Sequence, residues 1–334
     1  MPTVPEGDTG APPPADLPLI DLKGQRVVVT GGSGFIGAHV VAALCRAGAG
    51  VVSVDRRPAP PFRCHPSADH AVTDVLGDLR DEPVVEAAVT PGTAAIVHLA
   101  AQTQVLRSIQ DPRGSFENNV VVTEALLERA RGTGVSAFVL ASTNAVVGAG
   151  AGGILSESVP LGPLTPYGAT KAAGEMLLSC YNAAYGVRGV ALRFTNVYGP
   201  GMSEKDSIVP RLMRVAAGGG AFDVYGDGRQ LRDYVNVADV VSAVMLALRR
   251  PGLSGPVVIG STSSVSVLDL IDVVQKALGM TLRVNYVPAK AGEMPAVIVD
   301  TSVARSWGWA PSVSLEQGIA EVAAEWGSSL ARDV

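Results

Sequence analysis

The sequence predicts an α/β protein whose parallel sheet is covered by helices on both faces (a doubly wound sheet), with a smaller α/β domain toward the C-terminus. Three observations predict this fold. Short runs rich in β-branched residues alternate with longer helical patterns as far as about residue 195. The first such run leads directly into a glycine-rich turn, and the second ends in an acid. Regular alternation of this kind is typical of βαβ units, whose strands run parallel.

The individual elements follow from these patterns in chain order. Apolar, β-branched runs predict strands at 25–30, 51–55, 94–101, 136–143 and 187–199. Apolar residues at helical spacing predict helices at 34–48, 114–134 and 165–186, and further along the chain at 237–250, 267–279 and 315–326.

The pattern loosens after about residue 195, and this change predicts a division into domains. Residues 1–22 are rich in Pro, Gly and Asp, so we expect a disordered tail there. The sheet domain is expected to comprise residues 23–195 and about 234–250. The smaller domain is then expected to comprise 196–233 and 251–330.

Composition argues against several classes of function. The 334 residues carry a formal charge of −5 without a basic block, which argues against nucleic acid as a partner. No apolar run has transmembrane length, and the N-terminus lacks the basic start and apolar segment of a signal peptide. No metal site is expected from the scattered histidines. The three scattered cysteines indicate a reduced, cytoplasmic setting: Cys45, Cys64 and Cys180.

The glycine-rich turn has the features of a phosphate cradle. Gly31, Gly34 and Gly37 follow the first strand and open the first helix. Glycine lets the backbone turn sharply and approach a pyrophosphate without a Cβ in the way. The start of the helix then offers free N–H groups and a positive dipole. A purely structural turn is the alternative, because this glycine spacing alone is common.

Acids after the next two strands favour a dinucleotide as the ligand. Asp55 ends the second strand, 18 residues after Gly37, where a carboxylate can accept hydrogen bonds from an adenosine ribose. A 2′-phosphate would be repelled there, which favours NAD over NADP, although Arg56 and Arg57 follow directly. Asp78 is expected to end a third strand beside the adenine, with a solvated surface acid as an equal alternative.

A tyrosine and a lysine share one face of a predicted helix. Thr165 is its expected N-cap and Pro166 its first-turn proline, and Tyr167 and Lys171 stand four residues apart. A phenol is a poor base at neutral pH, but a nearby ammonium and a positive nicotinamide ring lower its pKa by favouring the phenolate. Thr143 ends a strand and is expected to reach the same substrate oxygen. A surface lysine beside a half-buried tyrosine is the plain alternative.

Further motifs follow in a fixed order. The chain contains "HLAAQ", "STNAVVG", "YGATK", "RFTNVYGPG" and "YGDGRQLRDYVNVADVV" after the glycine turn and the acid. In these motifs it resembles the extended short-chain dehydrogenase/reductase family, specifically its nucleotide-sugar epimerases and dehydratases, over about residues 25–328. The resemblance implies a Rossmann-like NAD-binding domain, a nucleotide-sugar-binding domain, NAD that stays bound and is recycled, and an NDP-sugar substrate, foremost a UDP-sugar.

The resemblance also implies roles for individual residues. The catalytic set is Thr143, Tyr167 and Lys171. Asn119 matches a structural and proton-relaying asparagine, with helix packing as the alternative, and His98 is interpreted as a packing residue. The residues implied to contact the cofactor are Gly31, Gly34, Phe35, Ile36, Gly37, Asp55, Arg56, Asp78, Leu79, Leu99, Ala100, Ala101, Tyr167 and Lys171. The residues implied to contact the substrate are Gln104, Thr143, Asn144, Asn196, Arg232 and Lys290, of which Asn196 and Arg232 meet the diphosphate. Relatives pair as homodimers through two helices, which match segments 116–134 and 164–186.

The residues after Thr143 favour one reaction within the family. Members oxidise C4 of the sugar to a 4-keto sugar, and 4,6-dehydratases then use an aspartate and a glutamate placed directly after the threonine. Asn144 and Ala145 stand there and cannot shuttle a proton as carboxylates do, so a 4-epimerase is predicted. Val147 and Lys290 replace a tyrosine and an arginine of the family pattern, which leaves the sugar open.

Four alternatives to a 4-epimerase stay open from the sequence. Two of them also recycle NAD: a dehydratase variant, and a C2 epimerase, which shares "STN" but carries a lysine where Ala145 stands. A keto-sugar reductase that uses NADP is supported by Arg56 and Arg57 alone. A non-catalytic NAD-binding regulator is disfavoured by the intact Thr143, Tyr167 and Lys171.

Overall fold

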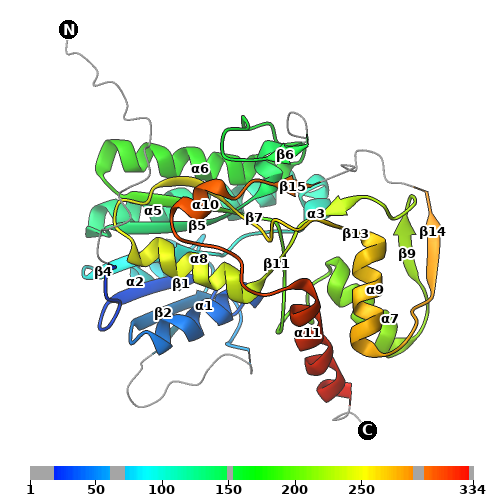
Figure 1. Ribbon diagram of the computed structural model, residues 1–334. Helices are drawn as coiled ribbons and strands as arrows, with labels where there is room; N and C mark the ends of the chain where they lie inside the picture. Colours follow the sequence, from blue (N-terminus) through cyan, green and yellow to red (C-terminus); the bar gives the residue numbers. More distant parts are fainter. Residues whose placement is uncertain (1–18, 61–71, 149–152, 289–296, 331–334) are drawn as a thin grey trace.

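A seven-stranded parallel sheet forms the centre of the protein, which confirms the predicted doubly wound fold. The computed structural model describes residues 19–60, 72–148, 153–288 and 297–330 (Figure 1). The strand order is β12-β7-β5-β4-β1-β2-β3, and every neighbouring pair is parallel. The strands are β1 Arg26–Thr30, β2 Gly50–Asp55, β3 Val72–Leu76, β4 Thr93–His98, β5 Ala137–Thr143, β7 Arg188–Phe194 and β12 Gly255–Ile259.

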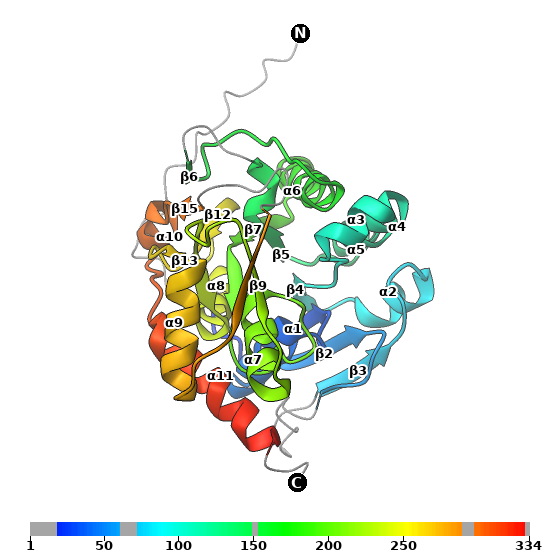
Figure 2. The ribbon, with the colours of Figure 1, turned by 90° about the vertical axis from the view of Figure 1, so that its right-hand side faces the viewer.

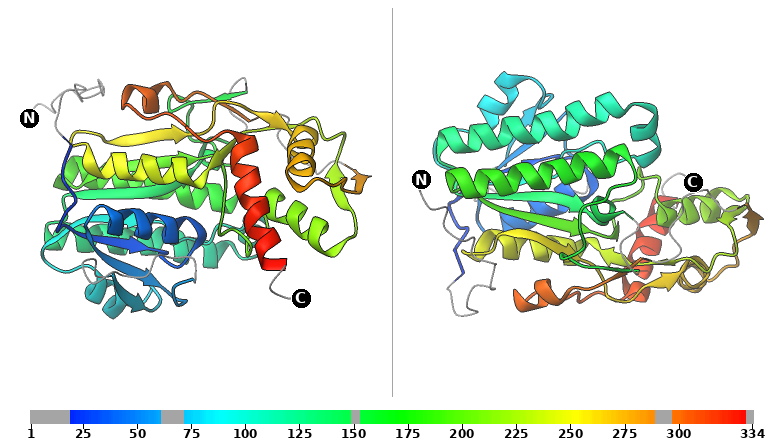
Figure 3. Two further views of the ribbon diagram at one scale, coloured as in Figure 1. Left: turned by 60° about the horizontal axis from the view of Figure 1, so that its bottom comes forward. Right: turned by 90° about the horizontal axis from the view of Figure 1, so that it is seen from above.

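Helices bury both faces of this sheet. On one face pack α1 (Phe35–Arg46) and α8 (Val237–Arg249), and on the other α2 (Glu82–Ala88), α5 (Val122–Thr133) and α6 (Pro166–Tyr185). Figure 3 shows each face in turn, with α1 and α8 in blue and yellow and α5 and α6 in teal and green. The inner strands are buried on both faces, which explains their continuous runs of valine and other apolar residues.

A second apolar core holds the smaller domain together. It is built from α7 (Ile208–Gly218), α9 (Val267–Leu278) and α11 (Leu315–Leu330), with β9 (Phe222–Tyr225) paired to β14 (Val284–Val287). Figure 2 views the molecule from the side of this domain. The domain division drawn from the sequence places residues 251–330 here, whereas the structure adds β12 to the central sheet through its pairing with β7.

Short elements complete the described structure. They are α3 Val105–Gln110, α4 Pro112–Phe116, the π-helical turn Glu117–Val121, the 3₁₀ turn Asn144–Val147, β6 Ile154–Leu155, β8 Asn196–Tyr198, β10 Leu231–Arg232, β11 Tyr234–Asn236, β13 Val265–Ser266, β15 Ile298–Val299 and α10 Ser302–Ser306. The strand expected over 187–199 is therefore two strands, because β7 ends at Phe194 and β8 pairs with β11 instead.

The end of the expected N-terminal tail packs on the sheet domain. Residues 1–18 lie outside the described residues, but Leu22 is buried in the core of the first face. The Ile20 N–H donates to the Arg249 carbonyl at 2.6 Å. Among the described residues, no helix combines the length and the apolar character that crossing a membrane requires.

A buried carboxylate on α8 fixes the chain segment that leads to α11. Asp239 accepts hydrogen bonds from the Ser312 N–H at 2.9 Å, the Ser312 hydroxyl at 2.8 Å and the Val313 N–H at 3.2 Å. The Trp309 indole donates to the Asp239 carbonyl and the Ser242 hydroxyl. These contacts connect the smaller domain's last helix to the sheet domain.

Replacing Asp239 by Ala is expected to lower the free energy of unfolding by about 3 kcal/mol, because three donors lose a charged acceptor. Asp272→Ala removes an exposed carboxylate from α9 and is the matched control, with an expected change within about 0.5 kcal/mol. Urea unfolding followed by circular dichroism measures both variants. Equal effects of the two substitutions would contradict this role of Asp239.

Candidate functional site

The glycine turn between β1 and α1 leaves no room for side chains. Gly31 adopts a positive φ of 70°, and a Cβ added there would lie 2.8 Å from the Ala100 nitrogen. A Cβ on Gly37 would lie 2.0 Å from the Gly31 carbonyl oxygen. The turn thus packs directly against the chain that follows β4, and its backbone and the start of α1 form a cradle that fits a pyrophosphate.

Asp55 stands beside this cradle at the end of β2. Its carboxylate accepts hydrogen bonds from the Ser33 N–H and the Arg57 N–H, both at 3.1 Å. Arg56 faces Asp78 at 3.7 Å, and Arg57 pairs with Glu204 at 2.7 Å. Both guanidinium groups thus face carboxylates, an arrangement that favours a ribose with free hydroxyls over one carrying a 2′-phosphate.

Asp78 and Leu79 follow β3 and form one side of the same region. Arg80 donates to the Asp78 carboxylate through Nε at 3.1 Å and Nη2 at 2.7 Å. This pairing lowers the pKa of Asp78 to about 2, so the side chain is a carboxylate at neutral pH. Leu79 is buried against the sheet. Arg80 thereby holds the Asp78 carboxylate, which is expected to lie beside the adenine, in a fixed orientation.

His98, interpreted from the sequence as a packing residue, is the centre of a buried hydrogen-bond chain. Thr123 donates its hydroxyl to the Asn119 carbonyl at 2.5 Å, so it accepts from His98 Nε2 at 3.0 Å. His98 Nδ1 then accepts from the Thr30 hydroxyl at 2.7 Å, and Thr30 accepts from the Ala100 N–H at 3.2 Å. Burial lowers the pKa of His98 to about 3, and nearby Lys171 adds to this effect.

The neutral imidazole connects the end of β1 with the chain after β4. Leu99, Ala100 and Ala101, the segment implied to line the cofactor, leave β4 at this point. The sequence around His98 does not indicate this hydrogen-bonding role, because the polar partners of His98 are threonines on β1 and α5, far away in the chain. With its pKa lowered in this way, His98 is neutral at neutral pH.

Asn119 sits in a π-helical turn, where the sequence predicts a regular helix. Its amide oxygen accepts from the Gln102 N–H at 2.7 Å, and its nitrogen donates to the Gln102 carbonyl and the Thr170 hydroxyl. The wider turn carries the side chain inward, between the chain after β4 and the start of α6. Asn119 therefore positions both segments of the site.

The predicted helix start brings the tyrosine and the lysine to the end of β5. Thr165 caps α6 by accepting from the Gly168 N–H at 3.2 Å, and Pro166 occupies the first turn, as predicted. Lys171 is buried and donates from Nζ to the Ala141 carbonyl at 2.9 Å. The Thr143 side chain faces the Tyr167 phenol and lowers its pKa. The structure thus brings the three expected catalytic residues together.

Burial opposes charge on both members of the pair. It raises the pKa of Tyr167 to about 12, while the neighbouring Thr143 side chain acts in the opposite direction. It lowers the pKa of Lys171 to about 8, and the Glu175 carboxylate partly offsets this decrease. Tyr167 can therefore act as a base only when additional positive charge is brought close to its oxygen.

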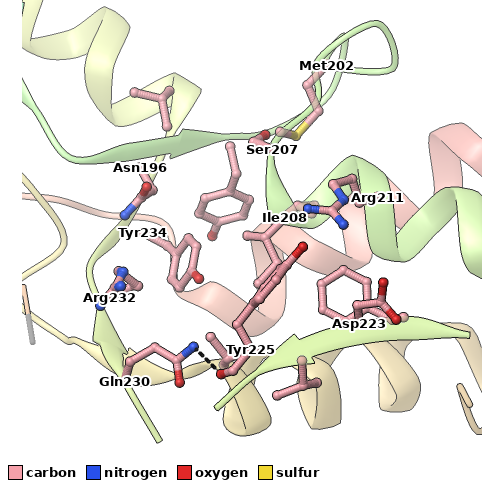
Figure 4. A pocket seen from close by; sticks show the side chains of 16 residues that line it. Asn196, Met202, Ser207, Ile208, Arg211, Asp223, Tyr225, Gln230, Arg232 and Tyr234 are labelled. Atoms are coloured by element: carbon pink, nitrogen blue, oxygen red, sulfur yellow. Dashed lines mark hydrogen bonds between the residues drawn. The ribbon is translucent and has the colours of Figure 1, made fainter. Parts of the chain in front are cut away.

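A cavity of about 290 Å³ lies between β8, α7 and β9 in the smaller domain. Figure 4 shows Asn196 and Arg232 on one side of it and Tyr225 pointing into its centre. The Asn196 amide donates to the Asp233 carbonyl at 2.9 Å, and Arg232 Nη1 donates to the Leu231 carbonyl at 2.8 Å. The two residues expected at the diphosphate thus line one cavity.

Several lining residues were not singled out from the sequence. They are Arg211, Asp223, Tyr225, Gln230 and Tyr234. For Asp223 and Tyr225 the sequence does hold a signal, because residues alternate between the two sides of a strand. Phe222 and Val224 belong to the smaller domain's core, so Asp223 and Tyr225 are expected on the opposite side of β9. The packing of α7 across the cavity has no signal of its own in the sequence.

The remaining expected site residues fall in different surroundings. Gln104 is exposed and precedes α3, and Asn144 is half-buried and accepts from the Thr143 hydroxyl at 3.3 Å. Phe35 is buried in the smaller domain's core and Ile36 packs beside it, so both join α1 to that domain. Lys290 lies outside the described residues.

Together, the glycine cradle, the acid after it and the tyrosine–lysine pair define a dinucleotide-dependent enzyme of the Rossmann type. The model of the NAD-dependent epimerase/dehydratase family matches residues 27–260. The chain belongs to this family, and thus to the extended short-chain dehydrogenases/reductases that its motifs resemble. NAD is the cofactor of the family, and the residues around the cradle fit it.

The most similar proteins include both epimerases and dehydratases. A putative UDP-glucose 4-epimerase of Methanocaldococcus jannaschii is 31% identical over 300 residues, covering 89% of this chain and 96% of its own. A dTDP-glucose 4,6-dehydratase of Streptomyces niveus is 33% identical over 314 residues, covering 90% and 92%. The crystal structure of the Thermotoga maritima UDP-glucose 4-epimerase with UDP-glucose superposes with a TM-score of 0.85 at 30% identity, covering 92% and 100%.

Gly37→Ala is expected to abolish retention of NAD and to lower the free energy of unfolding by about 1–3 kcal/mol, because the new methyl group overlaps the turn backbone. Gly132→Ala on α5 is the matched control, since a Cβ there meets nothing within 4 Å. Calorimetric titration with NAD measures binding to each variant. Native affinity in the Gly37 variant would contradict the cradle.

Proposed function

We propose that the protein is an NAD-dependent nucleotide-sugar 4-epimerase. The observation that carries this proposal is the pair of residues after Thr143. Asn144 and Ala145 begin the 3₁₀ turn after β5, and Thr143 accepts from the Ala145 N–H at 3.2 Å. An amide and a methyl group therefore stand where the dehydratase pattern has two carboxylates. The turn offers no proton donor for eliminating water from the sugar.

The residues around Tyr167 fit oxidation and re-reduction at one carbon. Bound NAD would supply the acceptor and donor of the hydride at C4. Tyr167 would take the proton of the C4 hydroxyl and return it after the sugar has turned, while Thr143 orients that oxygen. Lys171 would stabilise the phenolate through its charge. None of these steps requires a further acid or base beside Thr143.

The substrate that this proposal implies is a UDP-sugar, either a hexose or its uronic acid. Arg232 lines the cavity, and a guanidinium can bind two oxygens of a diphosphate at once. Tyr225 and Tyr234 add aromatic surface on which a base can stack. The relatives named UDP-glucose 4-epimerase support the same substrate class.

The proposal includes a homodimer built on the two segments that match the family's paired helices. Apolar side chains are exposed along these segments, among them Phe116, Val121 and Met176. Met176 lies on α6, and Phe116 and Val121 lie in α4 and in the π-helical turn, both of which contact α6. A second copy would bury this apolar surface.

Incubation with UDP-glucose or UDP-glucuronic acid in D₂O tests the reaction. The expected product is the C4 epimer without solvent deuterium, because the C4 hydrogen travels through the cofactor. NMR and mass spectrometry of the product measure both features. Loss of water together with deuterium at C5 or C6 would overturn the proposal in favour of a dehydratase.

Release of tightly bound NAD on denaturation is expected, and a protein that binds only added NADPH would favour a reductase.

Tyr167→Phe is expected to lower the rate of this interconversion by about 10²- to 10⁴-fold, because the acid–base group is lost. The NAD content and the melting temperature should stay close to those of the unaltered protein. Tyr286→Phe, at an exposed position on β14, is the matched control. A Tyr167 variant with full activity would exclude the catalytic role of the phenol.

A further inference from the structure

Three side chains on one face of α6 are each connected to one of three consecutive residues of β5. Tyr167 faces the Thr143 side chain, which lowers its pKa, and Lys171 donates to the Ala141 carbonyl. Ser142 lies between Ala141 and Thr143 on β5, and its hydroxyl donates to the Glu175 carboxylate. The spacing of four residues from 167 to 171 and from 171 to 175 places all three side chains on the same face of the helix.

Glu175 is also joined to the next strand of the sheet. Arg193 on β7 donates to its carboxylate through Nε at 3.0 and 3.2 Å and through Nη2 at 2.7 Å. Ser142 and Arg193 are direct partners in the β5–β7 register. The side chains of Glu175 and Arg193 are only 7% and 4% exposed, so the ion pair is shielded from water.

A buried ion pair is by itself weak evidence for stability, because both charges lose hydration. The position of this pair is more informative. It lies one helical turn beyond Lys171, whose ammonium is also buried and is bonded to a neutral carbonyl. Glu175 stands four residues from Lys171 on the same buried face of α6. Apolar residues of equal volume would hold α6 against the sheet without placing a carboxylate there.

We propose that Glu175 is a positioning residue for the Tyr167–Lys171 pair: its bonds to Ser142 and Arg193 fix the buried face of α6 against the ends of β5 and β7, and its carboxylate stands four residues from Lys171 on that face, where it favours the ammonium. The proposal rests on the proposed function only in assigning catalysis to that pair. It accords with the direction of the electrostatics, since burial lowers the pKa of Lys171 to about 8 and Glu175 raises it.

The other titratable groups near Lys171 do not replace Glu175. Tyr167 on α6 and His98 on β4 are neutral at pH 7, because burial raises the pKa of the former and lowers that of the latter. Glu157 lies beyond Arg193, accepts from the Val258 N–H at 2.6 Å, and has a pKa raised by burial. Among the described residues, Glu175 is thus the carboxylate through which the charge of Lys171 is supported.

NMR of the full-length protein labelled with ¹³Cε-lysine tests the proposal directly. The chain contains five lysines, and the Lys171 signal is assigned by its absence in Lys171→Arg. In Glu175→Gln, the pKa of Lys171 is expected to fall by about one pH unit, because the charged neighbour is lost. Glu128→Gln is the control, since Glu128 is also bonded to α6, through Tyr181, but is exposed. It should leave the Lys171 titration unchanged.

A second variant covers the case in which Glu175→Gln fails to fold, because that change leaves Arg193 buried without its partner. Glu175→Gln with Arg193→Gln removes both charges and is expected to move the Lys171 pKa in the same direction. An unchanged Lys171 titration in whichever variant folds would overturn the proposal. These titrations need no substrate, so the epimerase assignment can fail in the D₂O experiment while this result stands, and the reverse also holds.

Discussion

The seven strands of the central sheet run in the same direction, and the expected cofactor site depends on this constraint. Parallel strands bring their carboxyl ends to one edge. Gly31 follows β1 there, Asp55 ends β2, His98 ends β4 and Thr143 ends β5. Groups far apart in the chain therefore meet without long loops. The glycine turn adds a second condition, because only a residue without a Cβ can pack against the chain after β4.

Sequence patterns are sufficient to predict the features that depend on local chemistry. The turn at Gly31, the cap at Thr165 and the one-face placement of Tyr167 and Lys171 follow from glycine conformation, side-chain capping and helical spacing. The place of Thr143 at the end of its strand predicted that it would lie near Tyr167, and the structure brings the two side chains together.

Features that depend on non-local pairing could not be predicted in this way. The π-helical turn at Asn119 is a one-residue change in hydrogen-bond register, which leaves the apolar spacing of the sequence almost unaltered. The strand β12 joins the central sheet by pairing with β7. Because β7 lies more than sixty residues earlier in the chain, the sequence around β12 does not indicate this pairing. The hydrogen-bond chain through His98 depends on threonines from β1 and α5. For β12 and His98 the decisive neighbour is distant along the chain, and for the π-helical turn the local pattern is too similar to that of an α-helix.

The balance of charge at Tyr167 explains why the pair needs its surroundings. Burial raises the pKa of the phenol to about 12 and lowers that of the Lys171 ammonium to about 8, so desolvation opposes the charged form of both groups. Glu175 shifts the lysine back toward its cation, and a cationic nicotinamide ring beside the phenol would favour the phenolate further. Tyr167 therefore gives up its proton readily only when the neighbouring site carries positive charge. In the proposed epimerase, proton removal from the sugar would thus be coupled to the oxidised state of the cofactor, and a site without that charge would keep the phenol protonated.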